Sequence, residues 1–184
     1  MKIGNWKLII LILSVVIGFF WYLKYYKSED VVQNYPFTNP ELALRYEDEE
    51  LSFLVDYPEG FTVNNTGEEN VKVLVFSKKD SQESFQIFVM PYDEPGPITP
   101  ERILIDQPNI VMKDPQTVPI AGLPAMPAHA GQAGEEALVF FSTDPDIGDV
   151  REVWFVHSGH LYQASTYAKY DELLAKVMVT FGFK

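Results

Sequence analysis

The hydrophobic pattern changes sharply after the first 26 residues. Sixteen residues from Leu8 to Leu23 follow one another without a charge. A helix of that length would span roughly 24 Å at about 1.5 Å per residue, slightly less than a hydrocarbon core of about 30 Å. Aromatic and lysine residues at its ends suit the headgroup region: Trp6, Lys7, Lys24, Tyr25 and Tyr26. The pattern predicts a single membrane-spanning helix, which we assign to residues 1–27.

A cleaved secretory signal peptide would also begin with lysines, here Lys2 and Lys7, before an apolar stretch. Cleavage requires small residues directly after that stretch. Here it ends in the aromatic run 19–23, while Ser14 and Gly18 lie inside it. We therefore expect an uncleaved anchor.

The orientation of the anchor depends on its flanks. Two lysines precede the apolar run and two follow it closely, so the positive-inside rule gives no decision. Because a short N-terminal tail usually stays in the cytoplasm while a long domain crosses, we expect residues 28–184 to be extracytoplasmic. Residues 28–40 contain two prolines and several turn formers, and they are predicted to be a linker.

Short alternating segments separated by turn residues dominate residues 41–184, the predicted domain. In the stretch 71–77 every residue except Lys72 and Ser77 is apolar, as in a strand buried on both faces. Ser158-Gly159 is the strongest hairpin signal in the chain. The predicted strands are 42–46, 51–57, 61–64, 71–77, 85–90, 116–120, 136–143, 150–157 and 160–167. An irregular strand within 121–133 and a short last strand within 180–183 are also expected.

Two helices are predicted between and after these strands. Thr99-Pro100-Glu101 has the hydroxyl, proline and acid that begin helices, and Pro108 limits the helix to about two turns. The stretch 171–178 carries one apolar stripe behind two N-terminal acids. Many antiparallel strands with two helices indicate the α+β class, a sheet with helices packed against it.

Charge distribution narrows the range of partners. Residues 1–30 carry a formal charge of +2 and residues 31–184 carry −14, in a chain with 47% hydrophobic residues and no cysteine. Such a domain repels nucleic acid and anionic lipid. A divalent cation or a basic protein surface is compatible with it, although solubility alone also explains the charge. The lack of cysteine excludes disulfides, thiolate metal sites and a cysteine nucleophile.

Motifs of known chemistry are absent. The sequence has no nucleophile elbow, phosphate-binding glycine loop, dinucleotide fingerprint or H-E-x-x-H motif. We therefore predict a protein that is not an enzyme and needs no cofactor. A hydrolase of unrecognised type stays open as an alternative, and it would require a pocket that holds a perturbed carboxylate or histidine.

Five residues are candidate metal ligands. His157 and His160 flank the Ser158-Gly159 turn, close enough to share an ion such as zinc. Asp144, Asp146 and Asp149 concentrate carboxylates in one loop, as calcium sites do, but the spacing is not that of an EF-hand. Turn-forming aspartates and exposed histidines are the ordinary interpretation of both groups.

Several short segments occur in an order typical of one family. They are Tyr57-Pro58-Glu59-Gly60-Phe61-Thr62-Val63, the F-x-I-x-V stretch 85–89, Ile98-Thr99-Pro100-Glu101, Ile120-Ala121-Gly122-Leu123-Pro124-Ala125, Gly159-His160-Leu161-Tyr162 and the ending 173–183. Over residues 42–184 this order resembles the PsbP-like family, in a membrane-anchored bacterial form. The resemblance implies an antiparallel sheet flanked by helices, an α/β/α sandwich. Its best-known members are extrinsic subunits of photosystem II, and it implies a non-catalytic binding or assembly module with no catalytic residue to transfer.

These observations predict a membrane-tethered extracytoplasmic domain that binds a protein partner in the cell envelope. Loops carry recognition when a rigid sheet positions them, so we expect contacts at 91–97, 122–134 and 144–149. A divalent-cation-binding module is the alternative from another class.

Overall fold

The computed structural model describes residues 40–68, 70–120, 136–144 and 147–184. The predicted anchor and nearly all of the linker lie outside these residues, as do the contact loop 122–134 and the irregular strand predicted within 121–133. In the described part of the chain, no helix has both the length and the apolar character needed to cross a membrane.

The described elements are ten strands and three helical segments. The strands are β1 (Leu42–Asp48), β2 (Phe53–Pro58), β3 (Phe61–Asn65), β4 (Lys72–Lys78), β5 (Ser84–Pro91), β6 (Lys113–Pro119), β7 (Glu136–Asp144), β8 (Gly148–His157), β9 (His160–Tyr167) and β10 (Gly182–Phe183). The helices are α2 (Pro100–Asp106), the 3-10 turn η1 (Ala168–Tyr170) and α3 (Asp171–Thr180).

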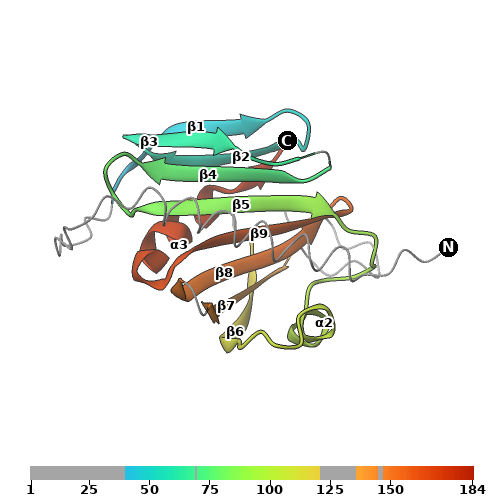
Figure 1. The fold of residues 1–184 in the computed structure, drawn as a ribbon. Helices are drawn as coiled ribbons and strands as arrows, with labels where there is room; N and C mark the ends of the chain where they lie inside the picture. Colours follow the sequence, from blue (N-terminus) through green and yellow to red (C-terminus); the bar gives the residue numbers. More distant parts are fainter. Residues whose placement is uncertain (1–39, 69, 121–135, 145–146) are drawn as a thin grey trace.

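Strand pairing produces two antiparallel sheets (Figure 1). The larger sheet has the order β3-β4-β5-β9-β8-β7-β6, and the smaller has the order β1-β2-β10. Each strand predicted within the described residues is present, with ends shifted by a few residues. The sequence pattern predicts a single sheet, and the structure differs from this prediction by dividing the strands between two sheets. This division arises because β2 pairs with β1 and β10 but not with the neighbouring β3.

The predicted β8–β9 hairpin is confirmed. Ser158 and Gly159 connect the strands with φ angles of 48° and 75°. Two successive positive φ angles fit a type I′ turn, whose twist matches that of the flanking strands. The ladder places His157 directly opposite His160 and continues to Val150 opposite Tyr167.

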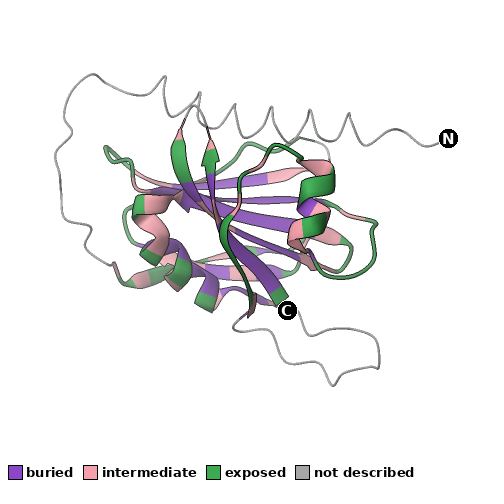
Figure 2. Cartoon of the chain, turned by 90° about the horizontal axis from the view of Figure 1, so that it is seen from below, coloured by how far each residue is buried: buried purple, intermediate pink, exposed green. Residues whose placement is uncertain are grey.

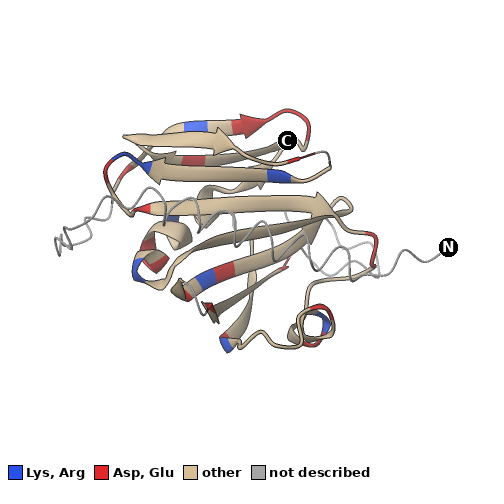
Figure 3. Cartoon of the chain, in the orientation of Figure 1, with Lys and Arg blue, Asp and Glu red and all other residues tan. Residues whose placement is uncertain are grey.

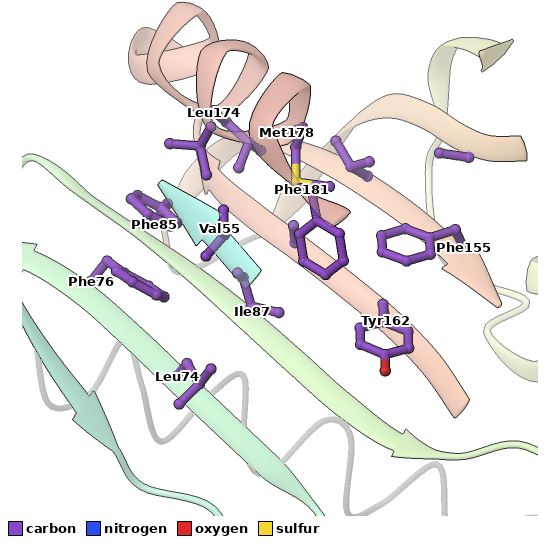
Figure 4. Packing of buried hydrophobic residues seen from close by; sticks show 14 of the residues in the cluster. Val55, Leu74, Phe76, Phe85, Ile87, Phe155, Tyr162, Leu174, Met178 and Phe181 are labelled. Atoms are coloured by element: carbon purple, nitrogen blue, oxygen red, sulfur yellow. The ribbon is translucent and has the colours of Figure 1, made fainter. Parts of the chain in front are cut away.

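One hydrophobic core lies between the larger sheet, the smaller sheet and α3 (Figure 4). Leu173, Leu174 and Val177 of α3 are fully buried there, so the predicted apolar stripe is confirmed. Aromatic rings stack within this core. Phe53 of the smaller sheet stacks on Phe181, which follows α3, at 5.1 Å between ring centroids, and Phe76 stacks on Phe85, its partner on the neighbouring strand of the larger sheet, at 4.4 Å. Offset stacking of this kind adds to the stabilisation from buried area.

A second core lies on the opposite face of the larger sheet. It contains Phe88, Leu138 and Trp154 from the sheet and Ile103 from α2. The buried positions therefore continue through both faces of the central strands, as Figure 2 shows. The stretch 71–77 follows this pattern, since Val73 and Val75 point into the second core while Leu74 and Phe76 point into the first. Helices thus lie on both faces, as the α/β/α prediction requires.

Candidate functional site

The short helix α2 begins where the sequence predicts. Thr99 has extended backbone angles, and its Oγ1 accepts the Arg102 N–H at 3.3 Å. Pro100 occupies the first turn, where its missing N–H costs nothing. At the other end, the N–H of Gln107 donates to Ile103 O at 2.7 Å. The helix is therefore capped at both ends, although it has only seven residues.

Arg102 fixes the loop that precedes α2. Its Nη1 donates to the carbonyl oxygens of Pro95 at 2.8 Å, Gly96 at 3.3 Å and Pro97 at 3.2 Å. Its Nη2 donates to Glu94 Oε2 at 2.5 Å, and the guanidinium lies over the Tyr92 ring, 5.2 Å from the centroid. One planar group thus satisfies three backbone carbonyls and a carboxylate, and this pre-organises the predicted contact loop 91–97.

Apolar side chains project into solvent beyond this loop. Leu104 is 42% exposed, Ile105 77% and Val111 57%. Single exposed apolar residues are ordinary, but here three occur within eight residues of a segment that the sheet and Arg102 hold in place. We call residues 94–111, with these three side chains, the α2 platform.

The α2 platform is acidic as well as apolar (Figure 3). Residues 94–111 contain Glu94, Glu101 and Asp106, against the single cation Arg102. Burial raises the pKa of Asp106 above its ordinary value, and the charge of Glu94 raises it further while Arg102 lowers it. With three acids against one cation, the α2 platform has a formal charge of −2, and a cation near it would be attracted.

An apolar pocket of about 200 Å³ lies elsewhere, between α3 and strands β6 to β8. Its charged lining residues are Arg151 and Asp171, which pair with each other at 3.0 Å between Nε and Oδ1. Val153 and Leu174 are among its apolar lining residues. Among the described residues, this lining places no nucleophile beside a base.

The most perturbed carboxyl group of the larger sheet faces away from that pocket. Burial raises the pKa of Glu152 to about 7, although hydrogen bonds from Trp154 and Ser142 lower it. Because side chains alternate along a strand, Glu152 and Arg151 point to opposite faces of β8. The pocket and the perturbed carboxyl thus do not combine into one site.

Two of the three aspartates predicted as calcium ligands form hydrogen bonds in or beside their own turn. Asp144 Oδ1 accepts the Ile147 N–H at 3.2 Å. Asp149 Oδ1 accepts from Thr143 Oγ1 at 2.7 Å and from Lys113 Nζ at 3.2 Å, and both contacts lower its pKa. Asp146 lies outside the described residues.

The two predicted histidines lie opposite each other across the β8–β9 hairpin. The His157 ring stacks on Phe183 with 3.5 Å between centroids, and His160 Nδ1 lies 3.1 Å from the Ser158 carbonyl oxygen. No three histidine or acidic side chains come together as metal ligands within the described residues. Metal binding stays a prediction for both groups.

Sequence reasoning missed Arg102 and Glu152. The signal for Glu152 was available, because it interrupts an apolar face that also contains Val150, Trp154 and Val156. Arg102 gave no comparable signal, since an arginine in the first turn of an exposed helix is common and its acceptors are backbone carbonyls.

Comparison with known proteins adds information about the fold. No family model matches the sequence, and no curated protein matches it either. Among solved structures, the solution structure of cyanobacterial PsbP (CyanoP) from Synechocystis sp. PCC 6803 is similar, with a TM-score of 0.50. The alignment covers 77% of this chain and 92% of that chain at 12% sequence identity. The chain therefore has a PsbP-like fold, as the segment order predicts, and at this identity the similarity concerns the fold alone.

Proposed function

We propose that this protein is a membrane-tethered, extracytoplasmic binding or assembly domain with no catalytic role. The α2 platform carries this proposal. It combines a loop fixed by Arg102 with exposed Leu104, Ile105 and Val111. A rigid surface with protruding apolar groups loses little conformational freedom when it binds, which favours association. The PsbP-like fold supports this role, because folds of this kind present loops on a sheet scaffold.

The chemistry of the platform indicates its partner. The exposed apolar side chains require an apolar counterpart, and the carboxylates at Glu94, Glu101 and Asp106 favour lysine or arginine around it. A domain of charge −14 would repel an anionic membrane surface. We therefore propose a protein partner in the cell envelope whose contact segment is apolar in the middle and basic at its ends.

Site-specific photo-crosslinking tests this proposal in native membranes. The full chain is made with a photoreactive amino acid at position 105, on the α2 platform, or at position 179, on α3. Val179 is a matched control because it is also apolar, helical and 62% exposed. We expect a discrete protein adduct from position 105 and none from position 179. Raising the salt concentration should weaken the adduct, since charged contacts at the rim are screened.

Competition with protein that lacks the photoreactive amino acid tests whether the adduct depends on the α2 platform. Adding Ile105→Asp protein should leave the adduct intact, whereas adding wild-type protein should reduce it. Equal adducts from positions 105 and 179, or competition by Ile105→Asp as strong as that by wild type, would mean that the α2 platform is not the contact surface.

Divalent-cation binding is the second candidate, favoured by the opposed pair His157 and His160. A third ligand would have to come from a partner, from solvent or from residues outside those described. Zinc titration of the full chain with thermal melting tests it, because a bound ion raises the melting temperature. A rise that His157→Ala and His160→Ala each abolish would support a zinc site. An unchanged melting temperature in micromolar zinc and millimolar calcium would remove the cation proposal.

A further inference from the structure

Strand β3 forms one edge of the larger sheet and lacks the features that usually protect such an edge (Figure 1). Natural edge strands contain charges, prolines or bulges, or they are very short. The other edge strands in the described part of the chain follow this rule. β1 has a bulge and three charged residues, β6 has an irregular register and two prolines, and β10 has only two residues. In contrast, β3 has the regular, uncharged sequence Phe61-Thr62-Val63-Asn64-Asn65, so its edge can accept a further strand.

The hydrogen-bonding pattern indicates which backbone groups of β3 face outward. Just beyond the strand, the Thr66 N–H donates at 2.9 Å to the carbonyl oxygen of Val73, which lies directly opposite when the β3–β4 register is continued. Hydrogen-bonded and non-hydrogen-bonded pairs alternate along an antiparallel ladder. Phe61, Val63 and Asn65 therefore direct their N–H and C=O groups away from β4. Among the described residues, none bonds to these outward groups, so they are available to an added strand.

Strand β1 of the smaller sheet lies over the same edge. The smaller sheet extends toward β3, because β10 contacts β9 while Tyr46 of β1 contacts Phe76 of β4, the strand partner of Val63. Leu44 is on the same face of β1 as Tyr46, and its partner on β2, Tyr57, also contacts Phe76. Leu44 thus faces the larger sheet, yet it is 37% exposed, and Val63 is only half-buried. An apolar side chain beside β3 would cover both.

The Asn65 end of this edge is negatively charged. Lys72 of β4 lies beside this end, and its Nζ pairs with Asp48 at 2.7 Å and with Glu50 at 3.0 Å. Glu68 follows three residues after Asn65 and is exposed. Three acids against one lysine would attract a basic residue at the adjoining end of an added strand. In an antiparallel arrangement, which all neighbouring strands of this sheet have, that end is the N-terminal one.

We propose that the β3 edge binds an extended segment of a protein partner as an eighth, antiparallel strand of the seven-stranded larger sheet. The segment has apolar side chains at alternate positions, which cover Val63 and Leu44, and a lysine or arginine at its N-terminal end beside Asn65. A second copy of β3 in the same position would bring its own overlying β1 against that of the first copy, so a single strand fits better. This surface is separate from the α2 platform and does not depend on the function proposed for it.

Peptide binding to the full chain in detergent tests this proposal. The probe is the peptide KKVTVTVTV with both ends blocked, and the readout is hydrogen exchange of the backbone amides followed by NMR. We expect the peptide to protect the Val63 amide in a saturable manner, together with the amides of Phe61 and Asn65. The amide of Asn64, which pairs with β4, should change little. Failure of the peptide to protect the Val63 amide would overturn the proposal.

N-methylated peptides are matched controls that leave the protein unchanged. In the proposed ladder the valines of the peptide lie opposite Phe61, Val63 and Asn65, so their N–H groups donate to β3 and those of the threonines point away. N-methylation of the valines should abolish the protection, and N-methylation of the threonines should preserve it. Replacing both lysines with glutamate should weaken binding several-fold. Equal binding of the two methylated peptides would show that the segment does not pair with the backbone of β3.

Two protein variants and the oligomeric state complete the test. Val63→Lys should lower the affinity for the peptide about tenfold, because an inward-pointing lysine protects a sheet edge. Val118→Lys, which changes a half-buried valine on the edge strand β6, should bind as wild type does. Equal weakening by both variants would contradict the assignment to β3. A free chain that sediments as a dimer with its Val63 amide already protected would make a second copy the occupant, and the proposal would be wrong.

Discussion

At the scale of single residues, buried charges contribute more to the stability of the fold than exposed ones. Lys72 Nζ lies 2.7 Å from Asp48 Oδ2, with the lysine side chain 16% exposed and the aspartate 3%. Arg45 and Asp56 pair at the same distance, but the arginine side chain is 54% exposed. Water screens the second pair and largely not the first. The two ion pairs have the same distance, but the buried one should contribute more to the stability of the fold.

The first prediction concerns Lys72→Met. Burial alone would raise the pKa of Asp48, but hydrogen bonds from Lys72, the Leu51 N–H and Tyr46 lower it below its ordinary value. Removing Lys72 leaves a buried carboxylate without its cation, so we expect a loss of about 2–3 kcal/mol in the free energy of unfolding at pH 7. Urea unfolding of the full chain in detergent measures this, with Arg45→Met as the exposed control.

The stabilisation that Lys72 provides through Asp48 should depend on pH. A carboxyl group whose folded pKa is lowered stabilises the fold above its unfolded pKa of about 3.9, and this contribution is lost as pH falls through the folded pKa. The difference between wild type and Lys72→Met should therefore shrink below about pH 4. A loss for Arg45→Met as large as that for Lys72→Met would contradict the assignment of burial as the cause.

Glu152 gives the opposite pH dependence. Because burial raises its folded pKa to about 7, the stability associated with the protonated form is complete below the unfolded pKa of about 4.3 and is lost as pH rises through 7. Glu152→Gln should therefore unfold at the same urea concentration as wild type near pH 4 and at a higher one at pH 8. The difference at pH 8 should reach at most about 4 kcal/mol, from a pKa difference of nearly three units at about 1.4 kcal/mol per unit. A difference independent of pH would show that Glu152 is not the titrating group.

At the scale of elements, turns decide the registers on which the sheet depends. The β8–β9 turn requires positive φ at Ser158 and Gly159, and a Cβ added at Gly159 would have room, since its nearest neighbour is Tyr92 O at 3.9 Å. The cost of a side chain there is one of backbone conformation and not of collision. We therefore expect Gly159→Ala to destabilise the protein by about 1 kcal/mol.

A substitution at the neighbouring Ser158 should stabilise the protein instead. Asparagine tolerates positive φ better than serine and is favoured in type I′ turns, so Ser158→Asn should raise the free energy of unfolding by a few tenths of a kcal/mol. Urea unfolding of both variants beside wild type tests the pair. If Ser158→Asn were as destabilising as Gly159→Ala, the turn would not have the type I′ conformation.

The elements predicted from sequence are those with local signals. Alternation and turn residues identify β8 and β9, and the apolar stripe identifies α3. The pairing of β2 with β10 has no local signal, because Gly182–Phe183 is only two residues long and lies far along the chain from Phe53–Pro58. The second sheet could not be predicted for this reason. At the site, exposed loop positions could be predicted, but the contacts of Arg102 with three carbonyls depend on backbone geometry that composition does not reveal.

At the scale of the whole molecule, the charge of the chain is divided between its two parts. The stretch 1–30 is positive and the stretch 31–184 strongly negative. The acidic domain would be repelled by anionic headgroups, so a membrane-spanning segment is the element that would hold it near a bilayer against this repulsion. In this proposed arrangement, the predicted linker of residues 28–40 would set the distance between the domain and the membrane. The side of the membrane then determines which partners the α2 platform can meet.

The last prediction concerns this side. Two lysines, Lys2 and Lys7, precede the apolar run, and Lys24 and Lys27 follow it, so orientation should respond to small changes in either pair. A reporter active only outside the cytoplasm, fused after Lys184, should be active in wild type. Replacing Lys2 and Lys7 with glutamine should lower this activity and raise that of a cytoplasmic reporter at the same position. Replacing Lys24 and Lys27 instead should leave the extracytoplasmic activity unchanged or higher, because the remaining positive charges then lie only on the cytoplasmic side. A wild-type fusion active only in the cytoplasm would place the platform, and the partner proposed for it, inside the cell.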